Sequence, residues 1–204
     1  MKKTKFNLKF ALLFLLIAIA IVILGLFSVT KFQDKKIEKL ESKIELLKEV
    51  STPVRFKIID KNNGKIHFAV KFYDSDGNVI NRQEFSLEGE ELSFDFFVIP
   101  VKDRYIAFPH KIFTNKIAPK DGENIFKLYD KNGFPEIFNS SGLDNDIKLG
   151  LQELFSQLKT ENIEDLEGLF GSGIQDIKGI SEFEKDNIYK IVSHTKGGIE
   201  ILSE

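Results

Sequence analysis

Residues 54–100 read VRFKIIDKNNGKIHFAVKFYDSDGNVINRQEFSLEGEELSFDFFVIP, and apolar residues recur at alternate positions through most of this stretch. A period of two is typical of strands that bury one face. The clearest case is residues 65–73, where one face consists of Ile66, Phe68, Val70 and Phe72. Polar turns separate the runs, and Asn63-Gly64 favours a hairpin because both residues tolerate a positive φ. We therefore expect a four-stranded antiparallel meander with one buried face.

The chain after residue 100 predicts further, less regular strands. Apolar runs cover residues 104–108, 110–117 and 124–129. Proline lacks the N–H that a sheet ladder needs, so Pro109 is expected to break the first run from the second. We expect these strands to form a second sheet packed on the first, or a curled continuation of it.

Helix signals begin near residue 140. One apolar stripe has the spacing of a single helix face and comprises Ile147, Leu151, Leu154, Phe155 and Leu158. A shorter helix is expected over residues 161–170, a loop over 171–181, and a terminal hairpin over 187–202 that pairs back into the sheet. The predicted fold class is α+β, an antiparallel β-rich, sandwich-like domain with one or two C-terminal helices and a terminal hairpin.

The N-terminal part of the sequence predicts a membrane anchor. Residues 10–29 read FALLFLLIAIAIVILGLFSV, twenty positions without a charge. As a helix this run is about 30 Å long, which matches the hydrocarbon core of a bilayer. It exceeds the usual length of a cleaved signal peptide's apolar region, and no typical cleavage site follows it. We therefore expect an uncleaved transmembrane signal anchor, in contact with membrane lipid, after a basic tail at residues 1–9.

The charge pattern bears on orientation. A short basic tail before the span and a long domain after it favour export of that domain, although six lysines that follow the span within twenty residues oppose this. We expect a single-pass protein of the cell membrane whose C-terminal domain is extracytoplasmic.

Residues 30–51 predict a helical stalk between the anchor and a soluble domain at residues 52–204. Its apolar residues follow spacings of three, four and three and are Ile37, Leu40, Ile44 and Leu47. This a/d pattern, with Ile at a and Leu at d, favours a short parallel coiled coil and hence a homodimer. An amphipathic helix that packs on its own domain is the alternative. Pro53 is expected to end the helix, because the residue before a proline avoids the α conformation.

Composition excludes several classes of function. Residues 1–50 hold ten Lys and five acidic residues, a net charge of +5, whereas residues 51–204 hold 19 basic and 26 acidic residues, a net charge of −7. An acidic domain lacks the field that attracts phosphate backbones, so no nucleic-acid partner is expected. The chain has no cysteine, which excludes disulfides, thiolate metal sites and a thiol nucleophile.

Two kinds of short motif in the domain, a calcium-loop pattern and Ser-x-x-Lys, do not indicate a functional site. Asp74, Asp76 and Asn78 alternate as in a calcium loop, but Val79 stands where the loop requires glycine and Phe85 where it requires glutamate. The two Ser-x-x-Lys matches, at Ser156 and Ser193, are no more than chance predicts in a lysine-rich chain. We interpret the Asp/Gly segments as turns and expect no serine acyl-enzyme.

Histidines and carboxylates offer no predicted site either. His67, His110 and His194 are isolated and lack metal-ligand spacing. Neighbouring carboxylates occur as Glu90 with Glu91, Asp144 with Asp146, and Glu164 with Asp165. They would support glycoside hydrolysis only if two of them faced each other across a cleft.

The sequence thus predicts no catalytic, cofactor or metal site. We expect a membrane-anchored interaction or scaffold protein of a bacterial-type cell envelope, with an envelope protein as its partner. The alternative is a small envelope hydrolase that acts through a carboxylate pair.

Overall fold

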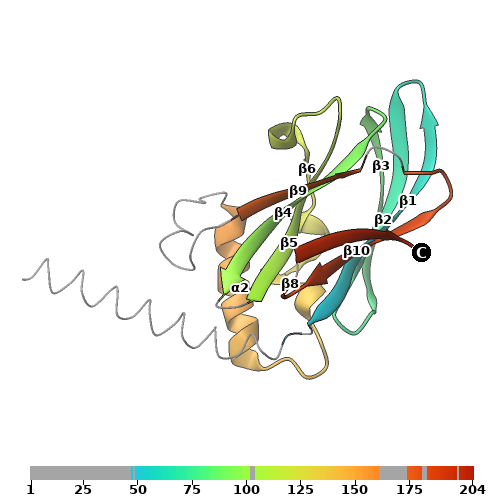
Figure 1. Ribbon diagram of the computed structural model, residues 1–204. Coiled ribbons are helices and arrows are strands. Elements are labelled where there is room, and N and C mark those ends of the chain that lie inside the picture. The colour runs from blue at the N-terminus through green and yellow to red at the C-terminus, as the bar shows by residue number, and fades with distance from the viewer. Residues whose placement is uncertain (1–46, 48, 102–103, 161–173, 181–182, 197) are drawn as a thin grey trace, which may run out of the picture. The chain divides into compact units, whose positions relative to one another are not determined.

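The computed structural model describes residues 47, 49–101, 104–160, 174–180, 183–196 and 198–204. These residues form antiparallel sheets and one long helix, which confirms the prediction of a β-rich antiparallel domain with a helix (Figure 1). The predicted anchor at residues 10–29 lies outside the described residues. Within the described part of the chain, no helix is long and apolar enough to cross a bilayer.

The first sheet has five strands in the order β11-β10-β1-β2-β3, with bounds Val50–Asn62 (β1), Lys65–Tyr73 (β2), Val79–Glu88 (β3), Ile188–His194 (β10) and Gly198–Ser203 (β11). The β1–β2 hairpin forms at Asn63 and Gly64, whose φ angles are 52° and 70°, as predicted. The terminal hairpin β10–β11 pairs back onto β1, with Tyr189 opposite Phe56. Both hairpin predictions are confirmed.

The second sheet has four strands in the order β6-β5-β4-β9, with bounds Leu92–Val101 (β4), Arg104–Thr114 (β5), Glu123–Asn124 (β6) and Ile174–Ile180 (β9). The predicted four-stranded meander is therefore wrong at its last strand, because β4 pairs with β5 and β9 and not with β3. Residues 94–99 are buried throughout, not on one face alone. A nearly continuous apolar run is the sign of a strand covered on both faces.

Three other predictions about strands need correction. Pro109 does not break the chain into two strands, because β5 continues through it to Thr114, well before residue 117. Phe96 pairs with Pro109 and Asp95 with Lys111, so His110 is the extra residue of a β-bulge. The bulge interrupts the ladder beside the proline, which has no N–H to contribute.

Residues 124–129 form no full strand, since β6 is followed by the short 3-10 helix η2 at Phe126–Leu128. Residues 174–180, expected to be a loop, form β9, which pairs with β4 along its length. The remaining short elements are η1 (Pro119–Asp121), β7 (Asp130–Lys131), β8 (Phe134–Pro135) and η3 (Glu136–Phe138).

The helix α2 (Asn145–Lys159) confirms the predicted stripe, since all five of its apolar residues are fully buried. The Asp144 side chain caps the helix by accepting a hydrogen bond from the Asp146 N–H at 2.8 Å. The shorter helix predicted at residues 161–170 lies outside the described residues.

The predicted stalk helix is wrong at its C-terminal end. Strand β1 begins at Val50, which lies opposite His194, and continues through Pro53. A register shift between Ser51 and Val54 accommodates the proline within the β1–β10 pairing. The strand partner thus determines the conformation here, not the helical pattern that precedes it.

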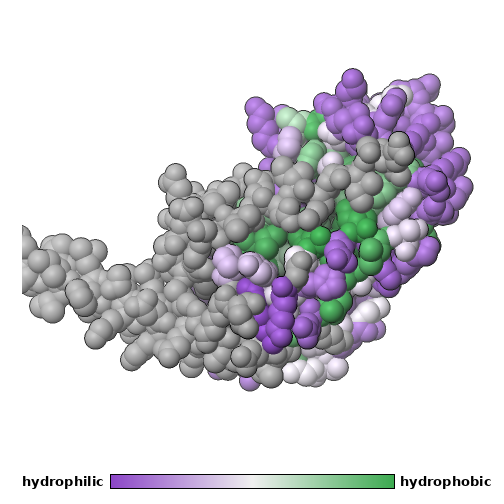
Figure 2. Space-filling model, viewed as in Figure 1, coloured by the Kyte–Doolittle hydropathy of each residue, from purple (hydrophilic) through white to green (hydrophobic). Residues whose placement is uncertain are grey.

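One aromatic-rich core joins the sheets and the helix. Phe56 of β1 contacts Phe94 of β4 with ring centroids 4.8 Å apart, and Phe72 of β2 contacts Tyr129 at 5.6 Å. Phe155 of α2 lies 5.4 Å from the same tyrosine ring. On the face drawn in Figure 2, hydrophobic residues lie in the middle and hydrophilic residues gather towards the upper and right-hand edge.

Candidate functional site

A row of four cations crosses the face of the five-stranded sheet that points away from the core. Lys190 of β10 lies opposite Arg55 of β1, Arg55 lies opposite Lys71 of β2, and Lys71 lies opposite Arg82 of β3. Residues that face each other in an antiparallel sheet project to the same side. We call Lys190, Arg55, Lys71 and Arg82 the basic row.

The basic row is costly for folding. Neighbouring strands lie about 4.8 Å apart, so the four positions span roughly 14 Å. Like charges directly opposite each other destabilise a sheet, and the row contains such a pair at each of its steps. Sequences tend to break a local rule of this kind where function requires it. This repulsion in a domain of net negative charge identifies the row as the candidate site.

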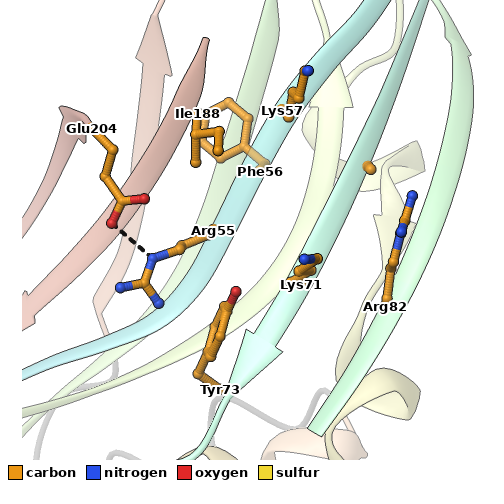
Figure 3. A pocket seen from close by; sticks show the side chains of 9 residues that line it. Arg55, Phe56, Lys57, Lys71, Tyr73, Arg82, Ile188 and Glu204 are labelled. Atoms are coloured by element: carbon orange, nitrogen blue, oxygen red, sulfur yellow. Dashed lines mark hydrogen bonds and ion pairs between the residues drawn. The ribbon is translucent and has the colours of Figure 1, made fainter. Parts of the chain in front are cut away.

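A groove with a volume of ≈ 520 Å³ runs beside the row (Figure 3). Arg55, Lys71 and Arg82 line it, and the other lining residues are Phe56, Lys57, Ala69, Tyr73, Ile188 and Glu204. Its size falls in the range of pockets that take small ligands or side chains. The groove combines several cations with apolar surface and one carboxylate.

Arg55 is the most highly organised cation of the groove. Its Nε donates to Glu204 Oε1 at 2.9 Å, and its guanidinium lies 4.5 Å from the centroid of the Tyr73 ring. Figure 3 shows the ring beside the guanidinium and the carboxylate on its other side. The hydrogen bond to Glu204 raises the pKa of Arg55, although partial burial acts in the opposite direction. Glu204 is thus an anion that the groove already holds.

The other cations differ in how far they are neutralised. Arg82 pairs with Glu84 at 2.7 Å and Lys57 with Asp186 at 3.0 Å. Both pairs are well exposed, so each contributes little to stability. Lys71, in the middle of the row, makes no ion pair with any carboxylate in the described part of the chain. Lys190 makes none among these residues either, but it does not line the groove, so an anion that enters the groove would gain most at Lys71.

Sequence reasoning missed a second feature, a buried polar pair beside the bulge. His110 Nδ1 lies 3.1 Å from Asp95 Oδ2, and the two side chains are 3% and 0% exposed. The imidazole packs against the rings of Phe97 and Phe126, with centroids 4.3 and 5.0 Å away. His110, which has no neighbouring ligand in the sequence, thus has a hydrogen-bonding partner within the fold. A group this enclosed cannot meet a substrate, so we interpret the pair as a hydrogen-bonded polar contact within the core.

The other residues considered from the sequence do not assemble into a site. Glu90 and Glu91 are exposed, Asp144 caps α2, and Glu164 and Asp165 lie outside the described residues. In the ranges that the structure covers, no three His or acidic side chains converge as metal ligands. The hydrolase alternative stays a prediction.

The segment at Asp74 forms the turn that we predicted. The Asp74 carboxylate accepts hydrogen bonds from the N–H groups of Asp76 and Asn78 at 3.0 and 2.7 Å. The two other histidines lie in exposed or half-buried surroundings, His67 at 3.4 Å from Ser86 Oγ and His194 at 3.5 Å from Glu200.

Of the four residues expected to mediate self-association, Ile37, Leu40 and Ile44 lie outside the described residues. Leu47 is buried and belongs to the hydrophobic core of the domain. Self-association through this segment stays a prediction.

Comparison with protein families, characterised proteins and solved structures finds no match to this chain at a significant level. The basic row and its groove are therefore interpreted from their own geometry.

Proposed function

We propose that this chain is a membrane-anchored interaction or scaffold protein of a bacterial-type cell envelope, and that the basic row binds its partner. The observation that carries the proposal is the register of Lys190, Arg55, Lys71 and Arg82 across four neighbouring strands. The expected partner is an envelope protein with an acidic surface.

The contrast between the row and the rest of the domain supports this proposal. Complementary charge speeds the encounter of two proteins and fixes their relative orientation. The net charge of −7 over residues 51–204 would repel the same acidic partner from other faces. A basic row on an acidic domain thus favours one docking orientation over the others.

The apolar segment at residues 10–29 completes the proposal. As a single-pass anchor it would keep the domain at the outer surface of the cell membrane, with the stalk predicted at residues 30–51, shortened at its end by β1, between the two. Tethering confines the domain and a membrane partner to a thin layer, which raises their effective concentration without any additional contact. A modest docking surface is then sufficient.

Charge reversal at the centre of the row tests the proposal. The full chain, tagged and solubilised in a non-ionic detergent, should recover an envelope protein in stoichiometric amount from cells. The Lys71→Glu variant should lose that protein, whereas Lys116→Glu, an equal charge change at an exposed loop residue, should retain it. Equal recovery by the parent and the Lys71→Glu variant would refute the basic row as the docking surface.

A further inference from the structure

We infer that the groove recognises carboxylate side chains of an acidic protein segment that also carries apolar residues, and that Glu204 occupies one carboxylate position in the free domain. This inference rests on the proposed function and names the chemistry of the partner. It also makes Glu204 an internal competitor of that partner.

Glu204 is held at the edge of the groove. Its backbone N–H donates to the Ile188 carbonyl at 2.8 Å, which holds residue 204 against β10 at the edge of the groove. From there its carboxylate accepts the hydrogen bond from Arg55. The Arg55 and Glu204 side chains are 31% and 33% exposed, so the contact is open to solvent and can exchange. The site is therefore shaped for a carboxylate and is reversibly filled by one.

The groove also has apolar walls, which favour a ligand with apolar side chains. The Ile188 side chain is 44% exposed, and Ala69 and the Tyr73 ring are half-buried between the cations. A bare phosphate polymer offers these surfaces nothing to bury. A peptide whose groove-facing side chains, every second residue when the peptide is extended, include both acidic and apolar residues can place carboxylates at the cations and apolar groups on the walls.

The length of the basic row sets how many carboxylates of one peptide can reach it. Its span of roughly 14 Å equals about four residues of extended peptide. Side chains on one face of such a peptide recur at every second residue, so two carboxylates reach the row at once. Lys71 is the natural partner for one of them, since Arg55 and Arg82 already contact Glu204 and Glu84.

Fluorescence anisotropy of the full chain in non-ionic detergent tests this inference. The probe is the labelled peptide Glu-Ser-Leu-Ser-Glu-Ser, here called the Glu–Leu peptide, which carries both Glu and the Leu on one face when extended. The same peptide with Gln in place of both Glu and inorganic polyphosphate are the comparison ligands. Glu204→Gln removes the competing charge and retains the side-chain shape, so the Glu–Leu peptide should bind about threefold more tightly. Glu90→Gln makes the same charge change at an exposed residue away from the groove and should leave the affinity unchanged. Lys71→Gln should weaken binding several-fold.

The outcomes separate the two proposals. Unchanged or weaker binding by the Glu204→Gln variant would show that Glu204 does not compete, and would overturn the inference. Lys71-dependent binding of polyphosphate in preference to the peptide would also overturn it, and would leave the basic row as an anion-binding surface. If neither probe binds in a Lys71-dependent way, the row itself fails as the docking surface, and the proposed function fails with it.

Discussion

Arg55 and Lys71 lie directly opposite each other on β1 and β2 because Ile59 forms a bulge between them and the hairpin turn. Near the turn Asn62 pairs with Lys65, and without the bulge the same register would place Arg55 opposite the buried Phe72. The extra residue shifts the pairing by one position and brings the two cations together. A local irregularity of one strand therefore creates the centre of the basic row.

The first prediction concerns the energetic cost of this arrangement. Lys71→Gln removes a cation that faces arginines on both neighbouring strands, so it should stabilise the domain by roughly 0.5 kcal/mol in low salt. At 1 M salt the gain should shrink, because screening weakens the repulsion between exposed charges. Urea denaturation of the full chain in non-ionic detergent measures both values, with Lys116→Gln as the control. A loss of stability in the Lys71→Gln variant would contradict the claim that the row is strained.

The second prediction concerns Gly89, where the chain passes from β3 to β4 and so from one sheet to the other. Its φ is +124°, and an added Cβ would lie 2.5 Å from Thr114 Oγ1. Gly89→Ala should therefore destabilise the domain by about 3 kcal/mol, from backbone strain together with a clash. Gly77 is the matched control, since it also has a positive φ but an added Cβ there meets nothing within 4 Å.

Gly77→Ala should cost about 1 kcal/mol, from backbone strain alone. The difference between the two variants in urea denaturation isolates the clash at Gly89. Equal losses would mean that the close approach of Gly89 to Thr114 does not constrain the passage between the sheets.

Much of the fold follows from the sequence because its signals are local. The alternation in β2, the Asn63-Gly64 turn and the stripe of α2 each depend on residues within one element, and all three are confirmed. The predicted meander failed at β4 because alternation cannot show which strand is the partner. Burial of β4 on both faces depends on how the whole domain packs and not on a single hairpin.

The candidate site was beyond sequence reasoning for a related reason. Each cation of the basic row looks like an ordinary outward residue of its own strand, and only the register across four strands brings them together. That register depends on the bulge at Ile59, and no pattern of residues in the sequence predicts this bulge. For Asp95 a signal did exist, because a lone carboxylate within the apolar run FDFFVI requires a partner inside the core. That His110 is this partner follows only from the bulge in β5, where His110 is the extra residue opposite Asp95 and Phe96.

The third prediction uses the buried phenol of Tyr129, which donates a hydrogen bond to the Pro109 carbonyl at 2.7 Å. Burial raises the pKa of Tyr129 well above its ordinary value of 10.0, and the nearby charge of Asp130 adds to this effect. The folded state therefore retains a proton that the unfolded chain loses above about pH 10. The stabilising contribution is complete below that pH and is lost as the pH rises towards the folded-state pKa.

The free energy of unfolding should fall by about 1.4 kcal/mol per pH unit in this alkaline range because of Tyr129. Tyr129→Phe should make the slope shallower by that amount, at a cost of about 1 kcal/mol at neutral pH for the lost hydrogen bond. Phe68→Leu, at a fully buried ring that carries no titratable group, should lower stability but retain the parental slope. Urea titrations between pH 8 and about pH 11 provide the measurement, and identical slopes for the parent and Tyr129→Phe would refute the role of the buried phenol.

The last prediction concerns the orientation of the proposed anchor. If residues 10–29 span the membrane with the basic tail in the cytoplasm, alkaline phosphatase fused after Glu204 should be active, because that enzyme matures only outside the cytoplasm. A fluorescent protein that folds only in the cytoplasm should be dark at the same position. Adding two lysines after residue 31 should reduce phosphatase activity, since positive charge that follows the span opposes its export. Two glutamates at the same place should have little effect, because acidic residues contribute little to this rule. A bright fluorescent fusion with an inactive phosphatase fusion would place the basic row in the cytoplasm and exclude an extracytoplasmic partner.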